Sequence, residues 1–169
     1  MALVVENGTG VAGANSYVSN TDYQNHHNLV SSVAFANTAQ EVDGAGFKAF
    51  GYLNSLRWKG LPVFGRQFAA AWPRRDVKDQ YGQSVDSTTI PNEVIQAQLI
   101  LMFSILNDEN DPHMTHNPLE PVVREKIDII DIQYAIPNME TGVMPVLPAV
   151  DNLLAGLVKQ PAVLAAFTA

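Results

Sequence analysis

Three stretches of the sequence hold residue types whose spacing could do chemistry, and the first is a glycine loop. Gly8-Thr9-Gly10-Val11-Ala12-Gly13 is a literal G-x-G-x-x-G that follows the apolar residues Leu3-Val4-Val5. In dinucleotide-binding folds these glycines let a turn between a strand and a helix cradle a pyrophosphate. Here the following residues, 15–18, do not begin a helix well, and the remainder of the chain suggests no parallel sheet. We therefore favour an extended N-terminal arm over residues 1–18, with a nucleotide-binding enzyme as a remote alternative.

The second stretch resembles a set of metal ligands. His113 and His116 follow a cluster of acidic residues at 108–111. Two histidines at this spacing meet on one face only in a helix, and the prolines on both sides disfavour a regular helix. A solvated acidic loop is our interpretation, and we expect no metal site. No serine elbow or matching histidine stands out, so we also expect no catalytic residues, no cofactor and no enzyme activity.

The third stretch combines aromatic and basic residues. Residues 48–78 hold both tryptophans and seven of the ten basic residues, with a single acidic one, Asp76. This segment carries a net charge of +6 and the rest of the chain −13, a separation typical of proteins that present different surfaces to different partners. The mixture from Phe47 to Tyr81 could contact phosphates and stack bases. We prefer the alternative that Trp58 and Trp72 pack against the main helices while the arginines face solvent or an acidic neighbour.

Length and composition limit the remaining possibilities. A chain of 169 residues is sufficient for one domain with a real core, and the absence of cysteine excludes disulfides and thiolate metal sites. The net charge of −7 argues against a general nucleic-acid coat. Apolar runs such as Leu99–Phe103 are far too short to cross a membrane, and no signal peptide is visible. We expect a protein of the cytoplasm or of something assembled there.

The elements that must position these residues are mainly helical. Apolar spacing and capping residues predict helices from Ser19 or Thr21 to Val30, from Ala39 to Arg57, from Pro91 to Leu106 and from Pro148 to Lys159. Residues 60–89 form a long connection, and residues 123–135 a short β element with a phase shift between Ile129 and Ile130. We predict a small bundle of about four helices in a domain over 19–159, followed by an uncharged docking tail over 160–169.

The order of several short motifs resembles a known family. The motifs are Val5-Glu6-Asn7-Gly8-Thr9-Gly10, Ala14-Asn15-Ser16-Tyr17-Val18-Ser19, Trp58-Lys59-Gly60, Ala71-Trp72-Pro73-Arg74, Ile90-Pro91 with Ala97, and Glu125-Lys126 leading to Tyr134. Over Val5 to Tyr134 the chain resembles the head–tail connector (adaptor) proteins of tailed bacteriophages, some of which are labelled DnaT-like single-stranded DNA-binding proteins. It departs from them at Asp128-Ile129, where the family often has Gly-Pro, and in the loop Val33–Thr38.

The resemblance implies a structural adaptor in the virion neck, made in the host cytoplasm during assembly. It would form a homo-oligomeric ring, commonly of twelve copies, below the portal, and would contact the portal protein and the tail or head-closure proteins. Packaged double-stranded DNA would pass through without specific binding, and no membrane would be involved. Either the arm or the tail would dock on the portal. The expected subunit or portal interface comprises Arg57, Trp58, Lys59, Arg66, Trp72, Arg74, Arg75, Pro161 and Phe167.

A second hypothesis uses the same residues differently. It is a single-stranded DNA-binding replication protein in which Trp58 and Trp72 stack bases and the neighbouring basic side chains contact phosphates.

Overall fold

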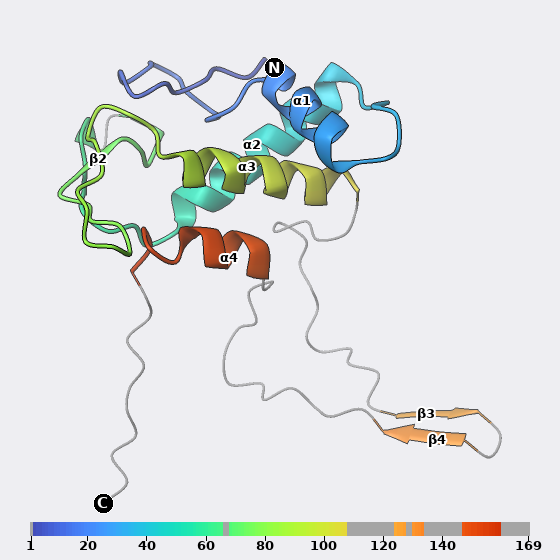
Figure 1. The fold of residues 1–169 in the computed structure, drawn as a ribbon. Coiled ribbons are helices and arrows are strands. Elements are labelled where there is room, and N and C mark those ends of the chain that lie inside the picture. Colours follow the sequence, from blue (N-terminus) through green and yellow to red (C-terminus); the bar gives the residue numbers. More distant parts are fainter. Residues whose placement is uncertain (1, 66–67, 108–123, 128–129, 134–146, 160–169) are drawn as a thin grey trace, which may run out of the picture.

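A computed structural model describes residues 2–65, 68–107, 124–127, 130–133 and 147–159. Within these residues the chain forms four helices and two small antiparallel sheets of two strands each (Figure 1). The predicted mainly helical bundle is confirmed. In chain order the elements are α1 (Asn20–Val30), α2 (Ala39–Ser55), β1 (Leu61–Pro62), β2 (Arg74–Arg75), α3 (Asn92–Leu106), β3 (Arg124–Ile127), β4 (Ile130–Gln133) and α4 (Pro148–Leu154).

The first two helices begin at capping boxes. The Ser19 hydroxyl accepts from the backbone N–H of Asp22, whose carboxylate accepts from the backbone N–H of Ser19 in return. Thr38 and Glu41 form the same reciprocal pair at the start of α2. Each box satisfies two backbone donors that a helix start otherwise leaves unpaired. The third helix begins at Asn92, so Pro91 occupies the N-cap position and not the first helical one.

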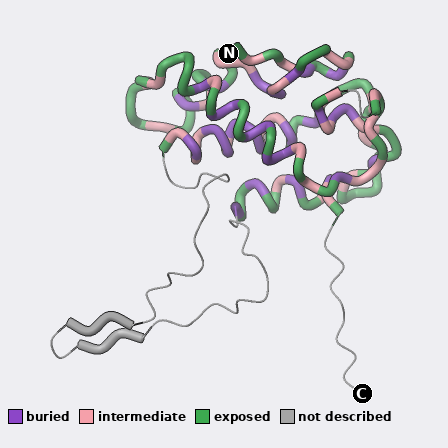
Figure 2. Tube along the Cα trace, turned by 180° about the vertical axis from the view of Figure 1, so that it is seen from behind, coloured by how far each residue is buried: buried purple, intermediate pink, exposed green. Residues whose placement is uncertain are grey.

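The third helix is central, as its nearly continuous apolar sequence predicts. It packs against α2, α4 and α1, and its residues Val94, Leu101 and Met102 have no exposed surface (Figures 1 and 2). A helix that is apolar on most faces is stable only when neighbours cover those faces. The core of the domain therefore forms around α3.

The last helix is shorter than predicted and ends at Leu154, not at Lys159. The reason is a pairing with a distant segment, because Val158 forms an antiparallel bridge with Trp58. The backbone N–H of Lys59 donates to Leu157 O at 2.9 Å, and that of Lys159 donates to Arg57 O at 2.7 Å. These backbone groups leave the helical pattern because they bond across the fold. The same pairing accounts for the end of α2 at Ser55, two residues before Arg57.

The N-terminal segment is not a helix, but it packs firmly onto the helical body. It folds back on itself through a parallel bridge between Val5 and Ser16, and Tyr17 belongs to the hydrophobic core. The fully buried amide of Gln98 in α3 accepts from the backbone N–H of Tyr17 at 2.7 Å and donates to Ser16 Oγ at 2.8 Å. A buried amide with both ends bonded fixes the position of its partners. Residues 14–18 are therefore part of the packed domain.

The predicted β element consists of two short strands. Strands β3 and β4 pair with Ile127 opposite Ile130, so only residues 128 and 129 connect them. Asp128 and Ile129, where the chain departs from the family's Gly-Pro, lie outside the described residues. Among the described residues, no helix is both long enough and apolar enough to span a membrane.

Candidate functional site

The two tryptophan motifs of the sequence meet in the fold. The rings of Trp58 and Trp72 lie edge to face, with centroids 5.5 Å apart. Their exposed fractions are 4% and 1%, and Trp58 Nε1 donates to Leu53 O at 2.8 Å. The prediction that the tryptophans pack in the core is confirmed. The hypothesis that they stack bases is wrong for this structure, because neither ring offers a face to solvent.

Arg74 joins the same two motifs through the backbone. Its guanidinium donates from Nε to Lys59 O at 2.7 Å, from Nη2 to Gly60 O at 2.9 Å and from Nη1 to Ala71 O at 3.1 Å. Burial lowers the pKa of Arg74 below its ordinary value. Strands β1 and β2 pair beside this contact, with Pro62 opposite Arg74. The predicted interface residue Arg74 therefore directs its donors into the protein.

Glycine at position 60 allows the strands to approach. A Cβ atom on Gly60 would lie 2.2 Å from Arg75 O and 2.6 Å from Val77 Cγ2, and the residue has a φ of +65°. Asp76 also has a positive φ of 60°, a conformation that aspartate adopts more readily than most residues. This local backbone brings Lys59 next to the segment that begins at Arg75.

The segment borders a surface hollow of about 630 Å³, which we call the basic hollow. Arg75 and Lys78 are exposed, and within the described part of the chain their side chains make no hydrogen bond or ion pair. Lys59 is half-buried, and its Nζ donates to Gly156 O at 2.6 Å. The residues that line the hollow are Lys59, Arg75, Asp76, Val77, Lys78, Asp79, Ser84, Val85 and Ser87.

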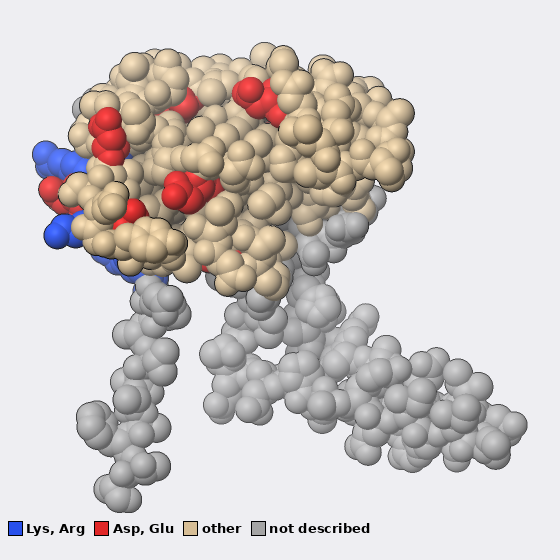
Figure 3. Space-filling model, in the orientation of Figure 1, with Lys and Arg blue, Asp and Glu red and all other residues tan. Residues whose placement is uncertain are grey.

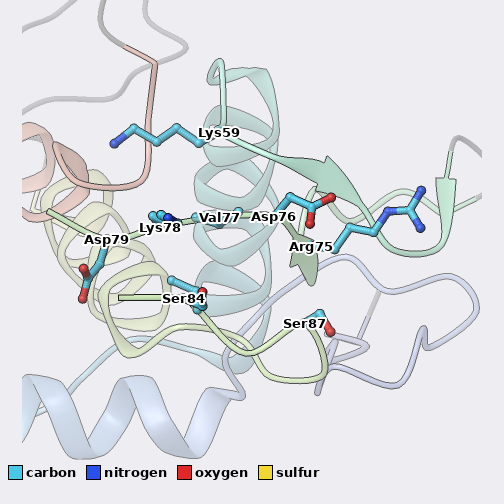
Figure 4. A pocket seen from close by; sticks show the side chains of 9 residues that line it. Lys59, Arg75, Asp76, Val77, Lys78, Asp79, Ser84 and Ser87 are labelled. Carbon is cyan, nitrogen blue, oxygen red and sulfur yellow. The ribbon is translucent and has the colours of Figure 1, made fainter. Parts of the chain in front are cut away.

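The cations of the hollow belong to one edge of the molecule. Figure 3 shows lysine and arginine side chains gathered beside β2, while aspartate and glutamate are scattered over the rest of that face. In Figure 4, Lys59 and Arg75 extend in opposite directions from the paired strands. Asp76 and Asp79 also line the hollow, so its positive charge is partly offset. The arrangement offers separate cationic contacts and no single anion pocket.

A turn next to the hollow presents an exposed tyrosine. The Asp79 carboxylate accepts from the backbone N–H groups of Tyr81 and Gln83, both at 2.8 Å. Lys78 and Ser84 form an antiparallel bridge at the base of the turn. Tyr81 at its tip is 79% exposed. Sequence reasoning did not single out this residue, although an aspartate three residues before Gly82 is a recognisable turn signal.

The glycine loop near the N-terminus already holds an anion, which belongs to the protein itself. The buried carboxylate of Glu6 accepts from Gly8 N at 2.8 Å, Gly10 N at 2.9 Å and Val11 N at 2.8 Å. Successive backbone N–H groups of this kind form a nest that binds anions in many proteins. Because Glu6 fills the nest, the G-x-G-x-x-G motif offers no support for a nucleotide site.

The other predicted residues fall in different places. Arg57 is exposed but does not line the basic hollow. Arg66, Pro161 and Phe167 lie outside the described residues, as do His113 and His116. Within the described ranges, no group of three or more histidine, aspartate or glutamate side chains could hold a metal ion.

Comparison with known proteins gives one match. The family model described as DnaT-like ssDNA binding protein matches residues 1–167. Because the match covers nearly the whole sequence, the chain belongs to this family. No curated protein and no solved structure matches the chain.

This membership corrects the identification of the chain as a phage head–tail connector. The family is described by single-stranded DNA binding and not as a structural component of the virion neck. The expected ring below the portal, its contacts with portal, tail and head-closure proteins, and the passage of packaged double-stranded DNA are therefore wrong. The second hypothesis, a single-stranded DNA-binding protein, agrees better with the match.

Proposed function

We propose that this member of the DnaT-like ssDNA binding protein family binds single-stranded DNA along the basic hollow, without catalysis. The family match over residues 1–167 is the observation that carries the proposal. The hollow supplies suitable chemistry, because Arg75 and Lys78 are exposed cations without partners among the described residues. Guanidinium and ammonium groups are the usual protein partners of phosphate oxygens.

The spacing of the cations favours a strand over a single phosphate. Lys59 and Arg75 extend in opposite directions (Figure 4), so they do not converge on one point. A chain of successive phosphates can contact both ends of such a surface. The hydroxyls of Ser84 and Ser87 line the same hollow and can donate to phosphate or sugar oxygens.

Electrostatics set limits on the expected affinity. The whole chain carries −7, so it does not attract DNA at long range. At about 0.1 M salt the screening length is roughly 10 Å, and within that distance the nearby cations dominate. If all three cations of the hollow neutralise phosphates, log K should fall against log salt with a slope of about −2. We expect moderate affinity that is lost readily as salt rises.

The test is an anisotropy titration of a fluorescent oligo-dT strand between about 50 and 200 mM salt. The informative variant is Arg75→Ala combined with Lys78→Ala, and the matched control is Lys48→Ala, an exposed cation of α2 that does not line the hollow. We expect the double variant to bind oligo-dT more weakly, and the slope of log K against log salt to become less steep by about 1.4. The control should bind like the unmodified protein. Equal binding by the double variant, or no binding at the lowest salt, would overturn the proposal.

A further inference from the structure

We infer that Tyr81 is a base-stacking residue, so that the protein selects strands with unpaired bases over duplex DNA and over base-free strands. The inference rests on the proposed function and specifies which part of the ligand is recognised. Phosphate contacts alone do not recognise an unpaired base, because all of these ligands have a phosphate backbone. Stacking requires the free face of a base, which a duplex does not offer within its length.

Exposure singles out Tyr81 from the other aromatic residues near the hollow. Trp58 and Trp72 are buried, and Phe64 and Phe68 are half-buried with their rings 5.1 Å apart. Among the described phenylalanine, tyrosine and tryptophan residues, only Tyr81 and Phe47 are classed as exposed. Phe47 belongs to α2, whereas Tyr81 belongs to the turn between Lys78 and Ser84, two residues that line the hollow.

The turn that carries Tyr81 is held in shape by hydrogen bonds to the side chain and backbone of Asp79. Asp79 accepts two backbone N–H groups through its side chain and one more, from Gly82, through its carbonyl at 3.1 Å. The backbone N–H of Asp79 donates to Gln83 O at 2.9 Å and closes the turn. Residues 80–83 carry no charge. A tyrosine on a fixed turn loses little conformational entropy when it stacks.

The turn also lies beside the cations of the hollow. Gln80 packs against α4's end so closely that a Cβ atom on Gly156 would lie 3.2 Å from Gln80 N. The carbonyl of that same Gly156 accepts from Lys59 Nζ at 2.6 Å. Lys78 stands at the base of the turn, opposite Ser84. A strand whose phosphates contact Lys59 and Lys78 would therefore pass close to the turn that carries Tyr81.

The experiment compares three ligands with the same number of phosphates: oligo-dT, an abasic strand and a blunt duplex. Tyr81→Ala should weaken oligo-dT binding about 5- to 150-fold, the effect of one lost stacking contact. The same change should leave the affinity for the abasic strand unaltered. Tyr81→Phe, which keeps the ring, should bind oligo-dT normally, and Phe47→Ala should match the unmodified protein on all three ligands.

The outcomes separate the inference from the proposed function. Normal oligo-dT binding by Tyr81→Ala, with loss in the Arg75 and Lys78 variants, would overturn stacking and leave the proposed function intact. Equal weakening of oligo-dT and abasic binding by Tyr81→Ala would also overturn stacking, since the ring would then act without a base. Failure of the unmodified protein to bind oligo-dT and the abasic strand would overturn both. Because Tyr81 is 79% exposed, the variants should fold normally, and thermal unfolding checks this.

Discussion

The guanidinium of Arg74 donates from Nε to the carbonyl oxygen of Lys59 at 2.7 Å, while the next residue in the chain, Arg75, is exposed at the basic hollow. Successive side chains of a strand point to opposite faces, and Arg74 and Arg75 form strand β2. One arginine therefore holds the two tryptophan motifs together, and its neighbour is available to a ligand. Identical residue types in adjacent positions have different tasks.

Replacing each arginine by lysine should separate these tasks. Arg74→Lys should lower the free energy of unfolding by about 2–3 kcal/mol, because a single ammonium cannot reach all three carbonyl oxygens that the guanidinium bonds. Arg75→Lys should change it by less than about 0.5 kcal/mol, since the side chain is exposed. Urea unfolding measures both. Equal midpoints for the two variants would contradict the structural role of Arg74.

The carboxylate of Glu6 should be essential to the N-terminal fold. Glu6→Gln replaces one of the two accepting oxygens by an amide NH₂ group, which faces a backbone N–H and cannot accept from it. Because the substitution removes both this acceptor and the negative charge, we expect it to lower the free energy of unfolding by about 2–3 kcal/mol. The control Glu93→Gln, at an exposed position in the first turn of α3, should cost less than about 1 kcal/mol. Chemical denaturation that ranks the two variants in the opposite order would refute the assignment.

Two glycines should respond to alanine in opposite directions. Gly44 lies inside α2 with open space around its α-carbon, so Gly44→Ala should stabilise the protein by roughly 0.5–1 kcal/mol. Gly60→Ala should destabilise it by more than about 1 kcal/mol, because the new methyl group meets Arg75 O at a positive φ. Melting temperatures that rise for Gly44→Ala and fall for Gly60→Ala are the expected result. A harmless Gly60→Ala would mean that the two strands can separate without cost.

Stability should fall in alkaline solution because of buried tyrosines. Burial raises the pKa of Tyr17, Tyr23 and Tyr52 above the ordinary tyrosine value of 10.0. Above about pH 10 the unfolded chain releases these protons while the folded chain retains them, so the unfolded state binds fewer protons. The contribution of these phenols to the free energy of unfolding is therefore constant below that pH and decreases as the pH rises through it.

Urea midpoints at about pH 8 and about pH 11 provide the measurement. The midpoint should drop at the higher pH, and Tyr17→Phe should reduce the drop because it removes one of the three phenols. The comparison concerns the change with pH and not the absolute midpoint, since this variant also loses hydrogen bonds to Asn54 and from Trp72 N. An unchanged midpoint at high pH would show that the phenols ionise freely in the folded chain.

Local signals in the sequence predicted much of the fold. The capping residues Ser19 and Thr38 mark helix starts, and the apolar run of α3 predicts a central position, because both effects depend on neighbours in the sequence. The early end of α4 was not predictable in this way. It depends on the bridge between Val158 and Trp58, which lies 100 residues earlier in the sequence.

The candidate site was predicted only as a region. Charge and aromatic content drew attention to residues 48–78, but periodicity does not tell which of two neighbouring arginines faces inward. The burial of Trp58 and Trp72 was the preferred interpretation, yet the stacking hypothesis still relied on them. Only the fold shows that their rings are covered and that Tyr81 is exposed. Likewise, the G-x-G-x-x-G pattern is typical of a phosphate site, but only the fold shows that the N–H groups of this loop bind Glu6, whose charge has the same sign as that of phosphate.

The most direct test of the central claim is an NMR titration of ¹⁵N-labelled protein with oligo-dT. It reports binding and its location in one measurement. We predict chemical-shift changes at the backbone amides of residues 75–87 and at Lys59, with little change in α1 and in the loop at 31–38. Shifts confined to those distant elements, or no shifts at an excess of DNA, would contradict single-stranded DNA binding at the basic hollow.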